Sequence, residues 1–307
     1  MQKRTSNLIL VIILIQIVNM NVLSLFDGIS CGNLALERAG LVASNYYSSE
    51  IDKYAINVTQ KNYPNTIQLG DITNISGSKL LQIDLLIGGS PCQGFSFAGK
   101  HLNFEDSRSK LFFEFVRLLN ECKPKYFLLE NVKMKKEYEN IISSYLGVYP
   151  KEINSSLFSA QNRRRLYWTN IPFDTNIKDK HISANSIIET NVDEKYFVSE
   201  TQLKRLKFNN ISDGIVKGCF SKPIINTDKS ECLLARDYKG ISGKQYFTMC
   251  IENSRLRKLT PIEYERLQTI PDNYTNYASD SQRYKMIGNS WTVDVICHIF
   301  KGLLIER

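Results

Sequence analysis

The chain has 307 residues, of which 43% are hydrophobic and 23% charged, and these proportions exclude disordered, collagenous and coiled-coil proteins. At about 150 residues per domain, the length allows one large domain or a large domain with a smaller one. The net charge of +8, from 39 Lys and Arg against 31 Asp and Glu, is compatible with a polyanionic partner but does not require one.

The first 20 residues have a basic start and an apolar run from Leu8 to Val18. This pattern is typical of a secretory signal, but it is too short to span a bilayer and lacks a small-residue cleavage site. The seven Cys, an odd number without C-x-x-C spacing, indicate free thiols and a reducing compartment. Residues 1–19 are therefore an extension upstream of a start at Met20, an ordered extra element, or an export signal. We expect a leader or extension on a cytoplasmic protein with no membrane segment.

From Asn21 onward, apolar runs alternate with amphipathic stretches. This alternation predicts an α/β fold with a doubly wound, mostly parallel sheet that is covered on both faces. The predicted strands cover residues 21–26, 42–49, 83–87 and 126–129, and the predicted helices begin near Gly32 and cover residues 107–122. Ligands bind at the carboxyl ends of such strands. The residues expected there are Asp27, Glu50, Asp71, the loop 88–96 and Glu130.

The pattern changes after Pro172, where Asn, Lys, Ser and Thr become frequent and no helical period is visible. We predict a smaller, loop-rich domain over residues 173–256, with the larger domain formed by 20–172 plus 257–307. Basic and aromatic residues alternate in the smaller domain, as they do on a nucleic-acid surface and also on a solvated face with a few core aromatics. A helical pattern is visible again from Thr260, which is predicted to cap a helix with Pro261 in its first turn and Glu263 at the capping-box position. A last helix is predicted from about residue 292 to residue 304.

The strongest chemical signal is the loop 88–96, Gly-Gly-Ser-Pro-Cys-Gln-Gly-Phe-Ser, which follows a predicted buried strand. Its three glycines and one proline suit a close approach of the backbone to a ligand. A free Cys is most often a small buried hydrophobe, and we expect this of Cys31, Cys122 and Cys297. For Cys92 the surrounding loop favours a nucleophile instead.

Two further segments carry charged side chains. Glu130 stands at the predicted end of a strand, where acidic residues are also often merely solvated. In residues 161–165, Gln-Asn-Arg-Arg-Arg, the alternate side chains of Gln161, Arg163 and Arg165 would point one way on an extended segment. The same run could equally be an exposed charged stretch. Spacing alone does not decide between these interpretations.

The turn at residues 26–32, Phe-Asp-Gly-Ile-Ser-Cys-Gly, lies between a predicted strand and a predicted helix. It lacks the G-x-G-x-x-G pattern, and the acidic side chain of Asp27 is unfavourable to a pyrophosphate. We therefore expect a cofactor that is neutral or cationic near this turn. This disfavours NAD and FAD and favours a nucleoside that carries a sulfonium amino acid.

In this order, the segments resemble the C5-cytosine methyltransferases that use S-adenosylmethionine. The resemblance runs from Asn21 to the C-terminus and depends on the S-P-C-Q-G-F-S loop, the E-N-V triplet, the Q-x-R-x-R run and G-N-S-W. It implies a class I, Rossmann-like methyltransferase fold, with a target-recognition domain at 173–256 that the segment 257–268 braces. It also implies a DNA (cytosine-5) methyltransferase that acts on a short DNA site.

The resemblance assigns the chemistry to Cys92, Glu130, Arg163 and Arg165. As a thiolate, Cys92 would add to carbon 6 of cytosine and make carbon 5 nucleophilic. Glu130 would protonate or hydrogen-bond ring nitrogen 3, and the two arginines would hold the base edge, Glu130 and the developing charge. The base that removes the carbon-5 proton is not identified. A stacked cytosine is out of reach, so it must be flipped out of the duplex.

The resemblance also implies a site for S-adenosylmethionine, which leaves as S-adenosylhomocysteine. Phe26 would stack on the adenine, Glu50 would accept from the ribose hydroxyls, and Asp71 with Ile72 would contact the adenine. The other residues would form the turn around the methionine part or line the pocket: Asp27, Gly28, Ile29, Ser30, Cys31, Pro91, Leu111, Asn289, Ser290 and Trp291. No metal site is predicted, because the three His are isolated.

The implied partner is double-stranded DNA, with a cognate restriction endonuclease as a further candidate, and the implied state is a monomer. The role would be restriction–modification or protection of phage DNA. Asp27 and Trp291 depart from many bacterial members and look closer to the eukaryotic de novo branch and some phage enzymes. Two alternatives remain. One is a tRNA methyltransferase, although the Cys-Phe-Thr signature of that branch is absent and residues 219–221 are only a near match. The other is an inactive DNA-binding relative, which the intact catalytic residues disfavour.

Overall fold

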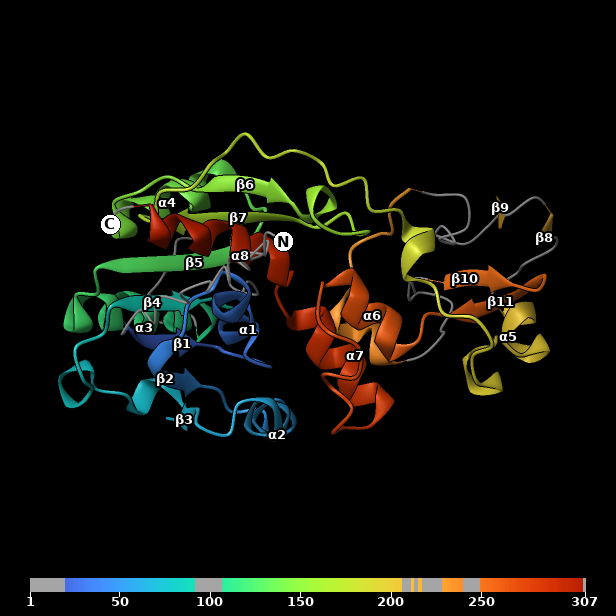
Figure 1. Cartoon of the computed structure of the whole chain (residues 1–307), viewed down its shortest axis with the longest axis horizontal. Coiled ribbons are helices and arrows are strands. Elements are labelled where there is room, and N and C mark those ends of the chain that lie inside the picture. Colours follow the sequence, from blue (N-terminus) through green and yellow to red (C-terminus); the bar gives the residue numbers. More distant parts are fainter. Residues whose placement is uncertain are drawn as a thin grey trace, which may run out of the picture.

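The computed structural model describes residues 20–91, 107–205, 211–212, 215–216, 228–239 and 249–305. Residues 1–19, Cys92 and many of the basic and aromatic residues of the predicted recognition domain lie outside these ranges. A larger lobe contains the main sheet, and a smaller lobe contains the hairpin β10–β11 (Figure 1). Within the described ranges, no helix is both long enough and apolar enough to cross a bilayer.

Seven strands form one sheet in the order β3-β2-β1-β4-β5-β7-β6 (Figure 1). Strands β1 to β5 pair in parallel, whereas β7 runs antiparallel to both of its neighbours. The strands are β1 Met20–Leu25, β2 Ala43–Ser49, β3 Ile67–Gln68, β4 Leu85–Gly88, β5 Tyr126–Val132, β6 Lys151–Asn154 and β7 Arg164–Thr169. The prediction of a doubly wound, mostly parallel sheet is confirmed. The strand order reverses between β1 and β4, which is where such sheets bind ligands.

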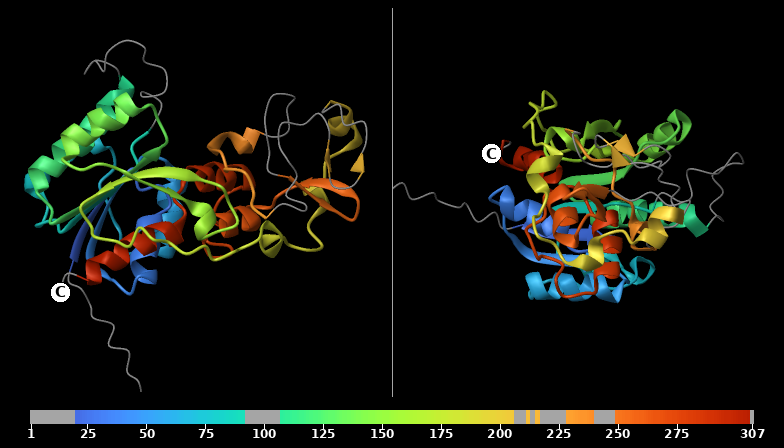
Figure 2. Two further views of the ribbon diagram at one scale, coloured as in Figure 1. Left: turned by 90° about the horizontal axis from the view of Figure 1, so that it is seen from above. Right: turned by 90° about the vertical axis from the view of Figure 1, so that its right-hand side faces the viewer.

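Helices cover both faces of the sheet (Figure 2). Since successive side chains of a strand point to opposite faces, the buried strands supply two separate cores. Val22 and Ile87 belong to the core that includes residues of α1, α2 and α8, whereas Leu23 and Leu86 belong to the core that includes residues of α3 and α4. These helices are α1 Cys31–Arg38, α2 Lys53–Asn62, α3 Ser107–Cys122, α4 Lys136–Leu146 and α8 Val293–Phe300.

Element boundaries follow the local sequence signals with two differences. Strand β5 continues to Val132, so Glu130 lies within a strand and not at its end, because β7 pairs along this stretch. The last helix stops at Phe300 and continues as a 3-10 turn, Lys301–Leu304. This helix packs on α1, where Arg38 and Asp294 form an ion pair of 2.7 Å, and it shares a core with Val22 of β1.

The smaller lobe contains one short helix that the sequence did not predict, because six residues are too few to show a helical period. The elements after β7 are α5 Glu200–Arg205, β8 Ile211–Ser212, β9 Ile215–Val216, β10 Met249–Glu252, β11 Arg255–Lys258, α6 Pro261–Leu267 and α7 Asp280–Asn289. The predicted capping box of Thr260 and Glu263 is present at the start of α6.

A buried charge cluster ties the hairpin β10–β11 to α6. Arg257 is fully buried, and it donates to both carboxylate oxygens of Glu263, at 2.8 and 2.9 Å, and to Glu252 at 2.6 Å. Removing one partner would leave a buried charge uncompensated, which typically costs about 3–5 kcal/mol of stability. Arg257 therefore fixes the hairpin against the part of the chain that was predicted to return to the larger domain.

Candidate active site

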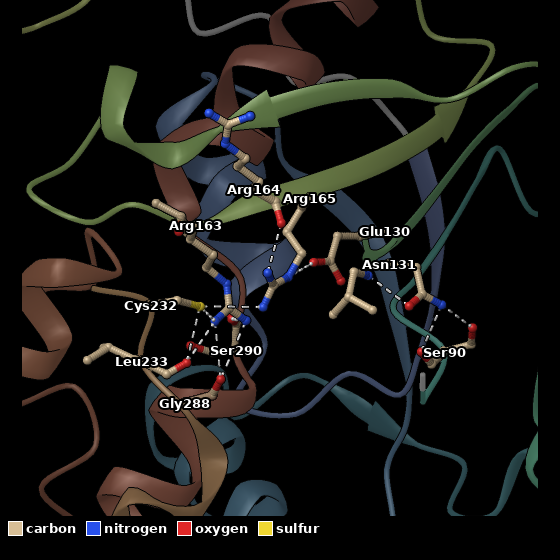
Figure 3. A network of polar contacts seen from close by, with 12 residues as sticks. Ser90, Glu130, Asn131, Arg163, Arg164, Arg165, Cys232, Leu233, Gly288 and Ser290 are labelled. Atoms are coloured by element: carbon tan, nitrogen blue, oxygen red, sulfur yellow. Dashed lines mark hydrogen bonds and ion pairs between the residues drawn. The ribbon is translucent and has the colours of Figure 1, made fainter. Parts of the chain in front are cut away.

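The centre of the candidate site is an ion pair between neighbouring strands. In the antiparallel register of β5 and β7, Val132 lies opposite Arg165, so Arg165 is diagonal to Glu130 on the same face. Arg165 Nε lies 2.9 Å from Glu130 Oε1 (Figure 3), and the two side chains are only 14% and 12% exposed. Burial alone lowers the pKa of Arg165, but the Glu130 carboxylate outweighs it and the pKa is raised. Both groups are therefore held in a fixed, mostly dry geometry.

Arg163 has different partners from those expected. Its guanidinium is buried and donates to the backbone carbonyls of Leu233 at 3.2 Å, Gly288 at 3.4 Å and Ser290 at 3.0 Å (Figure 3). Within the described part of the chain, no hydrogen bond or ion pair joins Arg163 to Glu130. Burial and the neighbouring charge of Arg165 lower the pKa of Arg163, but a guanidinium stays protonated. Arg163, which directly precedes β7, thus connects the start of this strand to two distant segments.

The alternation predicted for residues 161–165 is present. Gln161 is fully buried and donates to the carbonyl of Leu267 at 3.2 Å, whereas Asn162 and Arg164 are exposed. In Figure 3, Arg164 points away from Arg163 and Arg165. The run is therefore an ordered part of the site and not an exposed charged stretch.

Cys232 is a member of the site that the sequence did not indicate. Its sulfur lies 3.5 Å from Arg163 Nη1 and 3.9 Å from Arg165 Nη2 (Figure 3). Of the five cysteines that the structure describes, it is the one that is not buried, and Cys31, Cys122 and Cys297 are buried as expected. Cys232 falls in the predicted recognition domain, in a Ser-Glu-Cys-Leu-Leu run with no motif to mark it. Only the folded structure reveals that Cys232 belongs to the site, because only there does its thiol contact both arginines.

Helix α7 and the segment that carries Cys232 are in close backbone contact. A Cβ on Gly288 would lie 2.6 Å from the backbone nitrogen of Ala235 and from the carbonyl of Leu234. Only glycine permits this approach, because every other residue would place a side chain in the backbone of the facing segment. The contact positions Leu233 for its hydrogen bond with Arg163.

The start of the predicted nucleophile loop is anchored beside Glu130. Asn131 Nδ2 donates to the hydroxyl of Ser90 at 3.2 Å and to its carbonyl at 3.3 Å (Figure 3). A Cβ on Gly89 would lie 3.0 Å from Trp291 Nε1 and 3.2 Å from Glu130 Oε2. The described chain thus brings β4, β5 and the α7–α8 connection together at Gly89. Pro91 is exposed, and Cys92 lies outside the described residues.

The turn after β1 has an unusual backbone. Phe26, Gly28 and Ser30 have positive φ angles of 56°, 60° and 58°. Such conformations are costly for residues other than glycine, and they cluster at ligand sites. Glu50 supports the turn, since its Oε2 accepts from the Gly28 nitrogen at 2.8 Å while Oε1 accepts from the Ile51 and Asp52 nitrogens. A carboxylate has further lone pairs beyond these three bonds.

Several side chains of this turn point into the protein. Ile29 is 1% exposed and its carbonyl accepts from Tyr274, and Ser30 is fully buried, so that their side chains lie in the interior. Burial raises the pKa of the Cys31 thiol to about 12. The Asp27 carboxylate accepts hydrogen bonds from four hydroxyl groups.

The remaining candidates lie around this turn and beyond it. Asp71 Oδ1 accepts from the Thr73 nitrogen at 2.9 Å, and Ile72 is 4% exposed in the second core. Leu111 packs partly buried on the same core. Asn289 is exposed, Ser290 is buried and Trp291 is partly buried. Ile51, which the sequence did not single out, is 76% exposed directly beside Glu50.

The described ranges contain no group of three or more His, Cys, Asp or Glu side chains that could hold a metal ion.

Comparison with known proteins identifies the family. The model of the C-5 cytosine-specific DNA methylases matches residues 20–304. The Type II methyltransferase M1.ScrFI of Lactococcus lactis subsp. cremoris is 37% identical over 311 residues, which cover 92% of this chain and 77% of the relative. The Type II methyltransferase M.HhaI of Haemophilus parahaemolyticus is 31% identical, and the match covers 92% of this chain and 94% of that protein.

Solved structures share the fold. The methyltransferase EhMeth of Entamoeba histolytica superimposes with a TM-score of 0.75 at 22% identity, covering 94% of this chain and 99% of that one. DNMT2 of Spodoptera frugiperda, a mutant structure, gives a TM-score of 0.71 at 24% identity and covers 93% of this chain and 100% of that one. The larger lobe therefore has the class I methyltransferase fold. With the family model matched over residues 20–304, the chain belongs to the C-5 cytosine-specific DNA methylase family.

Proposed function

We propose that the protein transfers a methyl group from S-adenosylmethionine to carbon 5 of a cytosine that is flipped out of double-stranded DNA. The observation that supports this most strongly is the buried pair of Glu130 and Arg165 beside the anchored start of the Cys92 loop. The relatives include Type II methyltransferases and an orphan methyltransferase of Bacillus phage SPR. A role in restriction–modification or in protecting phage DNA is consistent with both kinds of relative.

Cys92 begins the reaction in this proposal. Its thiolate forms a bond to carbon 6 of cytosine, the 5,6 electron pair moves to the 4,5 position, and the 3,4 pair moves to nitrogen 3, which takes a proton from the protonated form of Glu130. When carbon 5 bonds to the methyl group, the electron pair returns to the 3,4 position and nitrogen 3 gives the proton back to the Glu130 carboxylate. After methylation a base removes the carbon-5 proton, the electron pair restores the double bond, and the sulfur leaves as thiolate. Splitting the reaction in this way replaces one difficult step by easier ones. Cys92 follows Ser90 by two residues, and Ser90 is held by Asn131, the neighbour of Glu130.

Arg163 and Arg165 have different roles in this proposal. Arg165 orients the Glu130 carboxylate and stabilises the charge that develops on the base. Arg163 is a positioning residue, since it holds the carbonyls of Leu233 and Ser290 and brings the segment of Cys232 to the site. Because its donors already face three backbone carbonyls, we assign it no direct contact with the base.

The residues at the carboxyl ends of β1 and β2 suit S-adenosylmethionine. Glu50 is held by three backbone nitrogens and keeps lone pairs for ribose hydroxyls, and the exposed Ile51 offers an apolar face to a nucleobase. The acidic turn at Asp27 suits a ligand with positive charge and disfavours a pyrophosphate. When bound, the cofactor supplies an electrophilic methyl group. The other candidates for this site are Phe26, Gly28, Asp71, Ile72, Pro91, Leu111, Asn289, Ser290 and Trp291, with the backbone of Ile29, Ser30 and Cys31.

The smaller lobe is proposed to recognise the DNA sequence. Residues 173–256 would form the target-recognition domain, and residues 20–172 with 257–307 the catalytic domain. Arg257 supports this arrangement, because it locks the hairpin of the smaller lobe onto α6. Residues 228–239 contribute Cys232 to the catalytic centre. The two proposed domains therefore differ in function, but part of the recognition domain lies against the catalytic residues.

The proposal is tested by bisulfite sequencing of DNA from a bacterial host that expresses the chain. We expect protected cytosines within one short sequence, and none in a host that expresses Cys92→Ser. Purified protein should incorporate methyl groups into duplex DNA and not into total tRNA. Unprotected genomic DNA, or incorporation into tRNA alone, would overturn the proposed substrate.

A further inference from the structure

A fully buried glutamine, Gln268, lies directly after α6 and uses every hydrogen-bonding position of its side-chain amide. Its Oε1 accepts from Gln161 Nε2 at 3.2 Å and from Thr292 Oγ1 at 2.7 Å. Its Nε2 donates to the carbonyls of Ile287 and Ser290, both at 3.1 Å. A side-chain amide has two donor hydrogens and two acceptor lone pairs, so this amide is fully satisfied.

Backbone groups fix the direction of these hydrogen bonds. The Leu233 nitrogen donates to Gln161 Oε1 at 2.9 Å, so the Nε2 of Gln161 faces Gln268 as a donor. Arg163 completes the arrangement, because it donates to the carbonyls of Leu233 at 3.2 Å and Ser290 at 3.0 Å. We call this closed set of hydrogen bonds the polar ring; its members are Gln161, Arg163, Leu233, Gln268 and Ser290.

The polar ring holds two segments that border the ion pair of the candidate site. Leu233 follows Cys232, whose sulfur contacts both arginines. Ser290 precedes Trp291, and the indole nitrogen of Trp291 lies beside Gly89 at the start of the predicted nucleophile loop. A displacement of either segment would therefore change the surroundings of the reacting groups.

Burial makes the polar ring sensitive to loss of the Gln268 amide. The Thr292 hydroxyl and one hydrogen of Gln161 Nε2 would lose their acceptor, and the Ser290 carbonyl would lose one of its donors. Buried polar groups without partners are unfavourable, so the segments that carry them would rearrange. Even a small misplacement of a catalytic group slows the chemical step.

We propose that Gln268 is a positioning residue for methyl transfer, which acts through Gln161 and Ser290 to hold the two segments that border the ion pair. The inference depends on the proposed function, because it assumes that this site transfers a methyl group. It differs from the bracing of the recognition domain that the resemblance implies, since none of the four partners of the Gln268 amide lies in residues 173–256.

The test is single-turnover methylation of duplex DNA by the full chain, with protein in excess and cofactor saturating. Under these conditions the rate constant does not depend on the fraction of protein that is folded. In Gln268→Met, which keeps the length of the side chain but has no amide, we expect the rate constant to fall about tenfold.

Gln268→Glu adds a readout that depends on pH. The protonated carboxyl of this variant keeps one donor, whereas the carboxylate keeps none. Its rate constant relative to wild type should therefore fall as the pH rises, while the relative rate constant of Gln268→Met should be the same at every pH.

Thr275→Val is the matched control, because Thr275 is also fully buried, but the described partners of its hydroxyl are Glu265 and Arg283, outside the polar ring. It should leave the rate constant unchanged. If Gln268→Met does not fold, Thr292→Val replaces it, since this change removes one hydrogen bond to the Gln268 amide and should slow methyl transfer about threefold.

A wild-type rate constant in Gln268→Met, or in Thr292→Val where that variant replaces it, would overturn the inference and leave the proposed function intact. An equal decrease in Thr275→Val, or a relative rate constant of Gln268→Glu that does not change with pH, would overturn it as well. A wild-type protein that transfers no methyl group to DNA would overturn the proposed function and this inference with it.

Discussion

Arg165 and Glu130 form their 2.9 Å ion pair because β7 runs antiparallel to β5 in a register that makes the two side chains diagonal neighbours. A shift of β7 by one residue would turn the Arg165 side chain to the other face of the sheet, away from Glu130. The pair therefore depends on the pairing of residues 126–132 with residues 164–169, which the strand-end signals alone do not specify.

Replacing Arg165 by Lys should lower kcat for methyl transfer about 100-fold, since Lys keeps the charge but loses the planar guanidinium that orients Glu130. Binding of cofactor should change little. Arg164→Lys is the matched control, because the Arg164 side chain is 71% exposed and points away from the site. Steady-state assays on duplex DNA compare the variants, and an equal effect of both substitutions would show that Arg165 has no special role.

Gly288→Ala should displace the segment of Leu234 and Ala235, since the new Cβ would meet backbone atoms at 2.6 Å. The hydrogen bond of Arg163 to Leu233 depends on that segment, so we expect methylation to fall at least tenfold, roughly the effect of misplacing a catalytic site. Gly147→Ala is the control, because its Cβ meets nothing within 4 Å although φ is 69°. This control should cost about 1 kcal/mol of stability and keep full activity. Normal activity of Gly288→Ala would contradict the role given to this contact.

Asp237 should make stability depend on pH. Its Oδ2 accepts from the Leu234 nitrogen and the Tyr264 hydroxyl, but its buried Oδ1 has no hydrogen-bond partner among the described residues. Burial raises the pKa of this carboxyl from 3.8 to about 6. The protonated Asp237 carboxyl therefore contributes to the free energy of unfolding in full below about pH 3.8, and this contribution is lost as the pH rises through about 6.

Asp237→Asn should remove this dependence. Urea unfolding at several pH values should show the variant gaining stability relative to wild type between about pH 4 and 6, and reaching a constant advantage of about 3 kcal/mol above pH 7. Parallel stability curves for the two proteins would show that Asp237 does not titrate in this range.

Features with a local cause could be predicted from the sequence. Helix α3 covers the predicted residues 107–122, because its apolar face repeats with the helical period over four turns. The capping box of Thr260 and Glu263 needs only a spacing of three residues, and it is present. Buried parallel strands are apolar on both faces, which made them visible as continuous runs.

Features that depend on distant residues could not be predicted. Arg163 binds Gly288, 125 residues further along the chain, and Cys232 reaches the arginines from a segment without any motif. The extension of β5 beyond Glu130 follows from pairing with β7, and the packing of α8 on α1 follows from the course of the whole chain. Motif spacing indicated which residues are candidates for the site, but it did not indicate which of these residues are in contact with one another.

The covalent step is the central claim, and trapping tests it most directly. Duplex DNA that carries 5-fluorocytosine at the methylated position cannot lose a proton from carbon 5, so the adduct with the enzyme should persist after methyl transfer. We predict a stable protein–DNA complex that forms only with S-adenosylmethionine, and mass spectrometry should map the DNA to the peptide that contains Cys92. Cys92→Ser should bind DNA and cofactor without forming the complex. An adduct on Cys232, or methylation that proceeds in Cys92→Ser, would contradict the account.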